Sequence, residues 1–301
     1  MSMHTVGILL LLLVTAFWGS TFSLVKDATE HMPTSSFIAW RFSIAILPLL
    51  LFLRKTNPKL WRDGMILGAW LGAGYITQAI GLQTIGANRA AFITGLNVIL
   101  VPIGLAVMTG RKISPGVWIS VVLCALGISL ISWEGGSLAI GDLWTLGCAL
   151  TYAGYIIYLE RTAKRHEVLP LTAIQILAVV LIGWLWAGIE ATQHMGHLED
   201  SLVTNFKAYL SVPPEALWPL IYLGLAATAL TTMLQVIGQK FVTAVEAAII
   251  YALEPVTASI FAFFWAGEVL GLRGISGGAL IVLAMVLSQL PDRKEIVPVQ
   301  E

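Results

Sequence analysis

The sequence predicts an all-α membrane protein with ten transmembrane helices in two inverted five-helix repeats. Composition is the first reason: of 301 residues, 57% are hydrophobic and only 11% are charged. A chain this apolar cannot cover a soluble domain with water-facing side chains. The second reason is a series of long apolar runs, and the third is a similarity between the two halves of the chain.

The apolar runs follow one another with short connections. A membrane-spanning helix needs about 20 mostly apolar residues and satisfies its backbone polar groups internally. The predicted helices cover residues 7–25, 34–53, 64–83, 87–108, 115–133, 141–159, 170–189, 216–237, 244–265 and 272–290. The first run is predicted to be a retained helix rather than a secretory signal, because no Lys or Arg precedes it and the apolar stretch continues to Lys26.

Helix-ending residues fill the connections between these runs. They occur at Met32-Pro33, Thr56-Asn57-Pro58, Ser114-Pro115-Gly116, Gly135-Gly136 and Val212-Pro213-Pro214. Only the loop at 190–215 is long enough to hold further structure.

The positive charges predict the orientation of the helices. Of the 17 Lys and Arg residues, 12 lie in connections on the side of the N-terminus, four lie in the opposite connections and Arg41 lies within a helix. Cytoplasmic loops hold an excess of Lys and Arg. We therefore expect a multi-pass protein of a bacterial inner (plasma) membrane, in contact with lipid and with both termini cytoplasmic. The net charge is zero and there is no basic patch, so no nucleic-acid partner is predicted.

An internal repeat relates the two halves of the chain. At an offset of 157 residues, 12 of the 53 positions between 79 and 131 are identical to their counterparts, where about four would match by chance. At the start of each half, residues 15–29 match 150–164 at an offset of 135. The difference of 22 residues is assigned to the loop at 190–215 in the second half. The predicted repeats are residues 1–133 and 134–301.

Five helices in each repeat is an odd number, which inverts the second repeat relative to the membrane. Inverted repeats are typical of secondary transporters, whose substrate site lies near the bilayer midplane between the halves.

Polar residues recur at matched positions of the two repeats. At the 157-residue offset the matched pairs are Gln78 with Gln235, Arg89 with Glu246, Thr94 with Tyr251, and Asn97 with Glu254. Asn97 and Glu254 lie eight residues beyond Arg89 and Glu246, or about 12 Å along a helix, and are predicted near the midplane.

Glu254 is the residue that most needs an explanation. A carboxylate within an apolar helix costs about 2.5–3.5 kcal/mol on insertion scales, so it indicates either a functional group or a structural hydrogen bond to another helix. The adjacent Pro255 has no N–H and is predicted to free the Tyr251 carbonyl, as Pro102 would free that of Val98. For a proline alone, a packing kink is the alternative.

Arg41 is the second buried charge. It is predicted to face the bundle interior, where Glu254 is one candidate partner. Alternatively, its long side chain extends to the headgroups or to Asp27 and Glu30. Aromatic residues such as Trp18 and Tyr155 could line a cavity or simply form helix contacts.

Other kinds of site find little support. His194 and His197 in the 190–215 loop have no convincing third ligand, and Cys124 and Cys148 fall within apolar helices. The chain has no phosphate-binding glycine loop, no HExxH and no nucleophile elbow. No metal, no cofactor and no catalytic residue is predicted.

Several segments together resemble the EamA-type members of the drug/metabolite transporter superfamily. They are AFWGSTF in the first helix, FIAWRF around Arg41, and ALEPVTASIFAFFWAGE from Ala252 to Glu268. The resemblance implies a central cavity formed by helices 1–4 and 6–9, with the fifth and tenth peripheral. It implies a substrate-binding site touching Trp18, Arg41, Gln78, Asn97, Tyr155, Gln235, Tyr251 and Glu254. Asn97 departs from the family, whose first repeat often has an apolar residue there.

The expected function is secondary transport of a small-molecule substrate, an amino acid or similar metabolite, by alternating access and in the direction of export. Proton coupling and uniport both fit the sequence, and the oligomeric state is left open. The alternatives are a non-transporting scaffold or receptor subunit, and a drug exporter. The drug exporter is disfavoured because no acidic residue occurs between Val6 and Val25.

Overall fold

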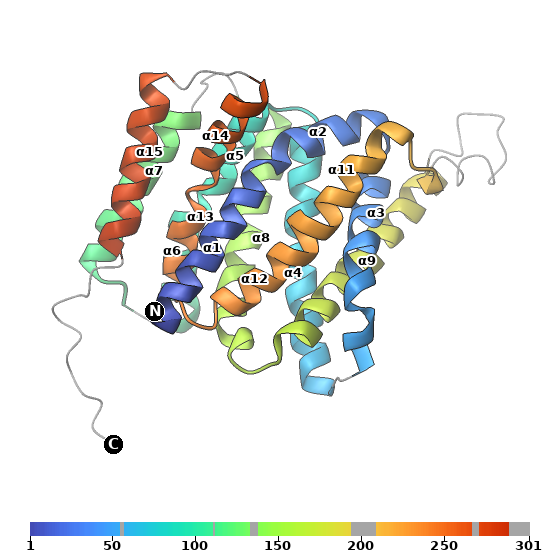
Figure 1. The fold of residues 1–301 in the computed structure, drawn as a ribbon, viewed down its shortest axis with the longest axis horizontal. Coiled ribbons are helices and arrows are strands. Elements are labelled where there is room, and N and C mark those ends of the chain that lie inside the picture. Colours follow the sequence, from blue (N-terminus) through green and yellow to red (C-terminus); the bar gives the residue numbers. More distant parts are fainter. Residues whose placement is uncertain (55–56, 111, 133–137, 194–208, 267–270, 289–301) are drawn as a thin grey trace.

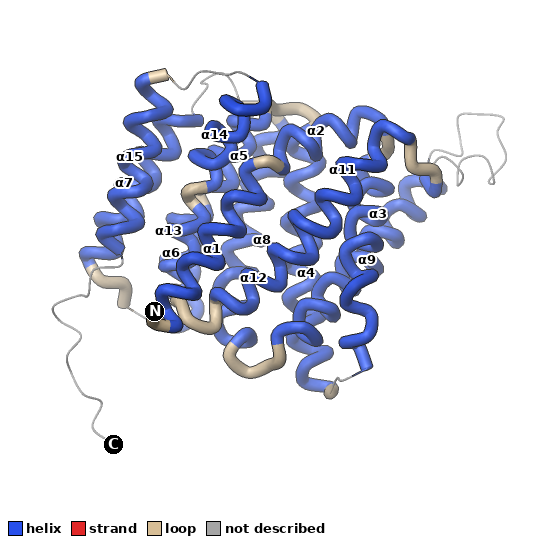
Figure 2. The backbone as a smooth tube through the Cα atoms, in the orientation of Figure 1, coloured by secondary structure: helices blue, strands red, loops and turns tan. Residues whose placement is uncertain are grey.

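In a computed structural model, the chain forms a bundle of helices with the N-terminus at one end (Figure 1). The structure describes residues 1–54, 57–110, 112–132, 138–193, 209–266 and 271–288. Within these ranges the backbone forms helices joined by turns and short loops, and no strand occurs (Figure 2). The all-α class predicted from the sequence is therefore confirmed for the described part of the chain.

The helices of the first half follow the predicted apolar runs. They are α1 (Met3–Gly19), α2 (Thr21–His31), α3 (Thr34–Ile46), the 3₁₀ helix η1 (Leu47–Arg54), α4 (Pro58–Leu82), α5 (Ala87–Gly95), α6 (Asn97–Thr109) and α7 (Pro115–Ser132). Local sequence sets several starts: the Asn57 side chain accepts a hydrogen bond from the Leu60 N–H at 2.9 Å, and Pro58 follows in the first turn of α4.

The second half contains one local departure from α-helical geometry. Its elements are α8 (Ile140–Ala163), α9 (Val168–Gln193), α11 (Pro214–Gly224), the π-helix η3 (Leu225–Leu230), α12 (Thr231–Gly238), α13 (Ala244–Tyr251), α14 (Glu254–Ala266) and α15 (Leu272–Ser288). Most of the predicted loop at 190–215, with His194 and His197, lies outside the described residues. Its first four residues belong to α9.

The outside of the bundle is apolar. Leu51, Val107, Leu185 and Trp218 are each more than 60% exposed. In the part of the chain that the structure describes, six helical stretches are long and apolar enough to cross a membrane: Met3–His31, Thr34–Arg54, Pro58–Leu82, Arg89–Met108, Val168–Gln193 and Pro214–Gly238. Two shorter apolar helices cover Pro115–Leu130 and Leu272–Leu287. The chain is thus a multi-pass all-α membrane protein, while the number of ten spans and their inverted arrangement stay predictions.

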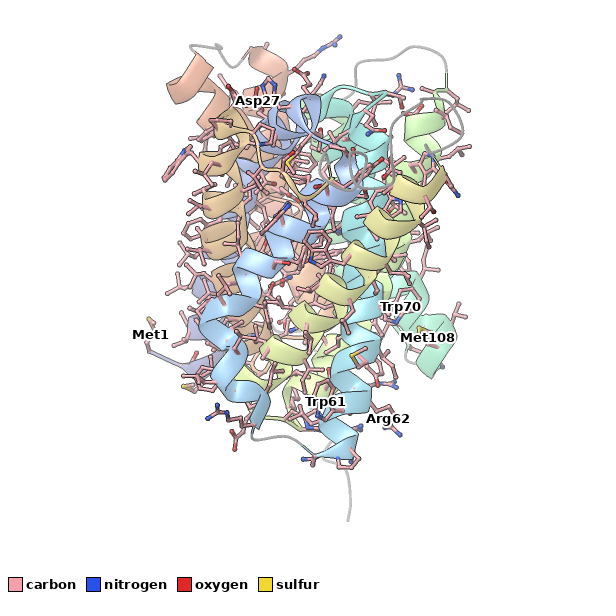
Figure 3. All side chains as sticks on the ribbon, turned by 90° about the vertical axis from the view of Figure 1, so that its right-hand side faces the viewer. Met1, Asp27, Trp61, Arg62, Trp70 and Met108 are labelled. Carbon is pink, nitrogen blue, oxygen red and sulfur yellow. The ribbon has the colours of Figure 1, made fainter. Side chains whose placement is uncertain are left out.

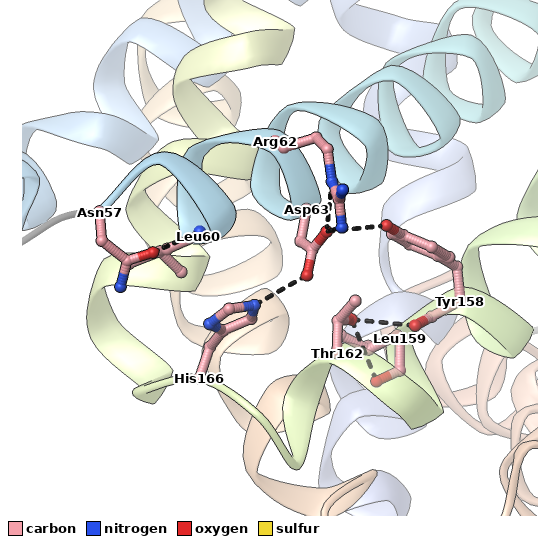
Figure 4. A network of polar contacts seen from close by, with 8 residues as sticks. All are labelled: Asn57, Leu60, Arg62, Asp63, Tyr158, Leu159, Thr162 and His166. Carbon is pink, nitrogen blue, oxygen red and sulfur yellow. Dashed lines mark hydrogen bonds and ion pairs between the residues drawn. The ribbon is translucent and has the colours of Figure 1, made fainter.

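The two ends of the bundle carry different polar groups. Asp27 lies at one end, and Trp61 and Arg62 lie at the other (Figure 3). At the Arg62 end, the buried Asp63 carboxylate accepts hydrogen bonds from Arg62 at 3.1 Å and from the Tyr158 hydroxyl at 3.1 Å, and it contacts His166 Nε2 at 2.9 Å (Figure 4). This cluster connects α4 with α8 and with the turn that follows α8.

Close helix contacts depend on glycine at a few positions. A Cβ added to Gly19 of α1 would lie 2.6 Å from the Ala258 backbone nitrogen in α14. The small residues after Trp18 therefore let α14 approach α1 directly. By contrast, α7 and α15 pack against each other at one edge of the bundle (Figure 1).

Gly19→Ala is expected to lower the free energy of unfolding by about 2 kcal/mol, because the added methyl overlaps backbone atoms that cannot move independently. Thermal unfolding in detergent measures the change. Gly188→Ala in α9 is the matched control, since a Cβ there meets no atom within 4 Å. Equal stability of the two variants would contradict the close contact between α1 and α14.

Candidate functional site

A cavity of about 430 Å³ lies inside the bundle, between the two halves of the chain. Its walls come from both halves, and most of the lining side chains are buried. The lining residues are Trp18, Thr21, Arg41, Gly74, Tyr75, Gln78, Thr94, Asn97, Cys148, Tyr152 and Glu254. Neither α7 nor α15 contributes to this wall, which agrees with the peripheral position that the family resemblance implies for them.

Each half of the chain has a helix break, and the two breaks lie at positions that the sequence repeat matches. The helix of the first half is interrupted at Leu96, and Asn97 begins α6. That of the second half is interrupted at Ala252 and Leu253, and Glu254 begins α14. Leu96 and Leu253 are 157 residues apart, which is the repeat offset. Asn97 and Glu254 thus occupy the same position, the first residue of a helix that starts at the cavity.

The breaks differ in part from the prediction based on proline. Pro255 lies in the first turn of α14, where its missing N–H removes no helical hydrogen bond. Pro102, however, lies inside α6, and the first-half interruption falls six residues earlier, at Leu96. The first-half interruption is therefore a separate feature from Pro102, since a single turn after Gly95 ends α5 without a proline. The freeing of the Val98 carbonyl by Pro102 stays a prediction.

Unpartnered polar groups surround the inner part of the cavity. Glu254 is 9% exposed, and within the described residues its carboxylate makes no hydrogen bond and no ion pair. The side-chain amide oxygen Oδ1 of Asn97 and the indole N–H of Trp18 are buried and also have no hydrogen-bond partner among the described residues. Buried polar groups are nearly always hydrogen-bonded in native proteins. Unpartnered groups such as these are therefore unusual inside a folded protein.

Arg41 belongs to the first half of the chain, and its side chain is hydrogen-bonded to residues of the second half. Its Nε donates to the Thr228 hydroxyl at 2.8 Å and an Nη2 hydrogen points to the Ala227 carbonyl at 3.4 Å. Both acceptors belong to the π-helix η3, whose wider turn leaves backbone carbonyls available, and π-bulges are frequent at functional sites. The guanidinium lies 4.6 Å from the ring centre of Tyr75, at cation–π distance.

The prediction that Arg41 faces the bundle interior is confirmed, and the alternative of a side chain reaching the headgroups is wrong. Arg41 is 1% exposed and does not extend to the surface. Arg41 and Glu254 both line the cavity, yet the described residues show no ion pair between them. The cavity wall thus presents one cation and one separate anion.

Aromatic side chains form the other side of the cavity. The ring of Trp18 lies 5.5 Å from that of Tyr152 and 5.2 Å from that of Tyr251, between ring centres. Gln235 Nε2 donates to the Tyr152 hydroxyl at 2.5 Å and to that of Tyr251 at 3.3 Å. Tyr155 stacks on Tyr152 at 5.4 Å. These contacts fix the ring of Tyr152, which faces the cavity.

The eight residues predicted for the site divide into two groups. Trp18, Arg41, Gln78, Asn97 and Glu254 line the cavity. The other three, Tyr155, Gln235 and Tyr251, lie behind this lining and hold it in place.

The sequence prediction missed six lining residues: Thr21, Gly74, Tyr75, Thr94, Cys148 and Tyr152. Helical spacing could have found three of them: Gly74 and Tyr75 lie four and three positions before Gln78 on α4, and Tyr152 lies three positions before Tyr155 on α8.

The chemistry of the cavity is that of recognition. It offers a guanidinium, a carboxyl group, hydrogen-bonding groups and aromatic rings on the walls of one cavity. Among the described residues there is no group of three or more His, Cys, Asp or Glu side chains that could hold a metal ion.

Comparison with known proteins places this cavity in a family. The chain is similar to an uncharacterized transporter of Archaeoglobus fulgidus, with 29% identity over 93% of this chain and 84% of that protein. It is also similar to the uncharacterized transporter YwfM of Bacillus subtilis, with 26% identity over 95% of both. One crystal structure matches with a TM-score of 0.72 and 16% identity, over 94% of this chain and 96% of that one, and shows a shared fold. The EamA-like transporter family matches residues 5–133 and 139–290, and the chain belongs to this family.

Proposed function

We propose that this protein is a secondary transporter that exports a small zwitterionic metabolite, an amino acid or similar molecule, through the central cavity. One observation supports this substrate class above the others: Arg41 and Glu254 face the same enclosed volume without pairing with each other. A zwitterion supplies the missing opposite charge at both positions.

Each end of the ligand has a matching group on the wall. An ammonium group of the ligand fits the Glu254 carboxylate and the unpartnered side-chain oxygen Oδ1 of Asn97. A carboxylate fits the guanidinium of Arg41, which its contacts with Thr228 and Tyr75 hold in a fixed position. The remaining part of the ligand packs against the rings of Trp18 and Tyr152.

The transport cycle proposed is alternating access between the two faces of a plasma membrane, with both termini in the cytoplasm. Support comes from the sequence repeat and from the matched helix breaks at Leu96 and Leu253. Export is proposed because many members of the family that the sequence resembles move their substrates outward.

A thermal-shift screen of the purified protein tests the substrate class. A ligand at 100 times its dissociation constant adds about 2.7 kcal/mol to stability. We expect amino acids to stabilise the protein, while their methyl esters and N-acetyl derivatives, each lacking one charge, give little change. Nucleosides, sugars and cationic drugs complete the screen. Stabilisation by neutral sugars or by cations alone would refute the zwitterion, and the absence of any ligand or flux would favour the scaffold.

A further inference from the structure

The Arg89–Asp142 ion pair connects the two halves of the chain at one end of the cavity. Arg89 Nε and Nη2 donate to the two carboxylate oxygens of Asp142 at 2.7 and 2.6 Å. Arg89 lies in the first turn of α5 and Asp142 in the first turn of α8, so each partner is on a helix segment that continues into the cavity wall. The side chains are 21% and 7% exposed. The pair therefore closes part of this end of the bundle.

A second pair occupies the opposite end. His4 Nε2 lies 3.1 Å from Glu246 Oε1, with Glu246 in the first turn of α13 and His4 in the first turn of α1. The carboxylate of Glu160, eighteen residues after Asp142 on α8, accepts a hydrogen bond from the Ala244 N–H at the start of α13. Eighteen helical residues span about 27 Å, so the two pairs are separated by most of the length of α8.

One member of each pair corresponds in the repeat. Arg89 and Glu246 are 157 residues apart, and each is the third residue of its helix. Asp142 accepts a hydrogen bond from its own helix start at Ala139 N–H, as Glu246 does from Thr243 N–H, both at 2.7 Å. The acidic and basic partners have changed places between the two pairs. The carboxylate lies on α8 in the Arg89–Asp142 pair and on α13 in the His4–Glu246 pair.

Close backbone contacts accompany both pairs. A Cβ on Gly141, beside Asp142, would lie 2.7 Å from the Gly81 carbonyl oxygen. A Cβ on Gly7, one turn after His4, would lie 3.0 Å from the Gly238 carbonyl oxygen. Gly81 and Gly238 are again 157 residues apart. Each of the two pairs is thus accompanied by one close helix crossing, and both the pair and the crossing join the first half to the second.

We propose that the Arg89–Asp142 pair and the His4–Glu246 pair are the two latches of the transport cycle, one at each end of the cavity. Opening one end requires the two halves to separate there, which breaks the latch at that end while the other stays closed. Both latches are formed in this structure, consistent with the mostly buried cavity lining. This inference rests on the proposed alternating access.

The latches also differ in strength. The Asp142 latch is bidentate and largely buried, whereas the Glu246 latch is a single contact whose His4 side chain is 44% exposed. Charged, bidentate and buried pairs are the stronger kind. We therefore expect the ligand-free protein to open more readily at the Glu246 end than at the Asp142 end.

Cys148 supplies a probe inside the cavity. With Cys124→Ser as the background, Cys148 is the remaining cysteine. Its thiolate displaces methanesulfinate from a membrane-impermeant methanethiosulfonate to form a mixed disulfide, and the rate of this labelling reports access from the face exposed to the reagent. Vesicles of both orientations give the two rates. We expect Arg89→Gln to raise labelling at least about fivefold from the Asp142 face and to lower it from the other face. Glu246→Gln should shift both rates in the opposite sense.

Matched controls separate a latch from a general loss of stability. Glu215→Gln and Glu167→Gln remove exposed carboxylates near the Asp142 end and the Glu246 end, respectively, and should leave both rates unchanged. Arg89→Gln combined with Asp142→Asn should equal the Arg89→Gln variant alone, since one interaction is removed only once. Rates that rise together from both faces, or do not differ from the controls, would overturn the latches but leave transport standing. Labelling from one face only, in wild type and in every variant, would instead overturn alternating access.

Discussion

Glu254→Gln is expected to weaken binding of the zwitterionic ligand about 100-fold and, at the same time, to stabilise the ligand-free protein. A hydrogen bond to a charged group contributes about 1.5–3 kcal/mol, and each 1.4 kcal/mol is a tenfold change in affinity. Without ligand the carboxylate is buried and has no partner among the described residues. An isolated buried charge destabilises the folded state, so a neutral amide of nearly the same shape should relieve that cost.

Thermal unfolding with and without ligand measures both effects on the same samples. Glu254→Asp keeps the charge and should retain most of the binding, while Gln78→Glu adds a carboxylate elsewhere on the wall and should not replace Glu254. Proteoliposome flux over a range of pH provides the functional measurement. Normal flux of Glu254→Gln at every pH would exclude both charge balance and proton coupling at this residue.

Asp63→Ala is expected to lower the free energy of unfolding by about 3 kcal/mol or more. Its carboxylate is 1% exposed and bonds to three side chains, including the largely buried His166. Removing one member of a buried pair costs about 3–5 kcal/mol, because the partners are left without their charge complement. His166 also accepts a hydrogen bond from Lys240 through its backbone carbonyl at 3.1 Å, so the loss should extend to the turn after α12.

Arg62→Ala is the control for this variant. The Arg62 side chain is 66% exposed, and an exposed ion pair contributes at most about 1 kcal/mol. Thermal unfolding of both variants in the same detergent gives the comparison. If Asp63→Ala were no less stable than Arg62→Ala, the cluster at this end would not be stabilising the contact between α4 and α8.

The sequence predicted the described helices well because apolar runs of this length leave few alternatives. The errors of the prediction lie at the helix ends, where single residues determine at which position a helix begins or stops. The helix predicted from residue 64 begins at Pro58, because Asn57 caps a polar first turn that apolar runs do not reveal. The helix predicted at 7–25 begins earlier, at Met3, where the Ser2 side chain accepts a hydrogen bond from the Thr5 N–H, and it continues as α1 and α2 to His31.

The sequence could predict the site residues that are charged or polar within apolar helices. It could not predict contacts and helix breaks that depend on the backbone geometry. Glu254 and Arg41 are charges in apolar helices, and the repeat pointed to Asn97. The partners of Arg41 could not be predicted, because the carbonyl of Ala227 is available only through the π-helix, and no residue type signals that wider turn. Nor does composition signal the break at Leu96, which has no proline at its start.

The equivalent positions of Asn97 and Glu254 would give the proposed binding site a direction. If both helix breaks carried the same residue, a ligand between them could bind in either of two orientations with equal affinity. One neutral amide and one carboxylate remove that degeneracy. A ligand that enters with its ammonium group toward α14 would leave in the same orientation, so the helices exchange their exposure to the two sides while the molecule between them does not turn over.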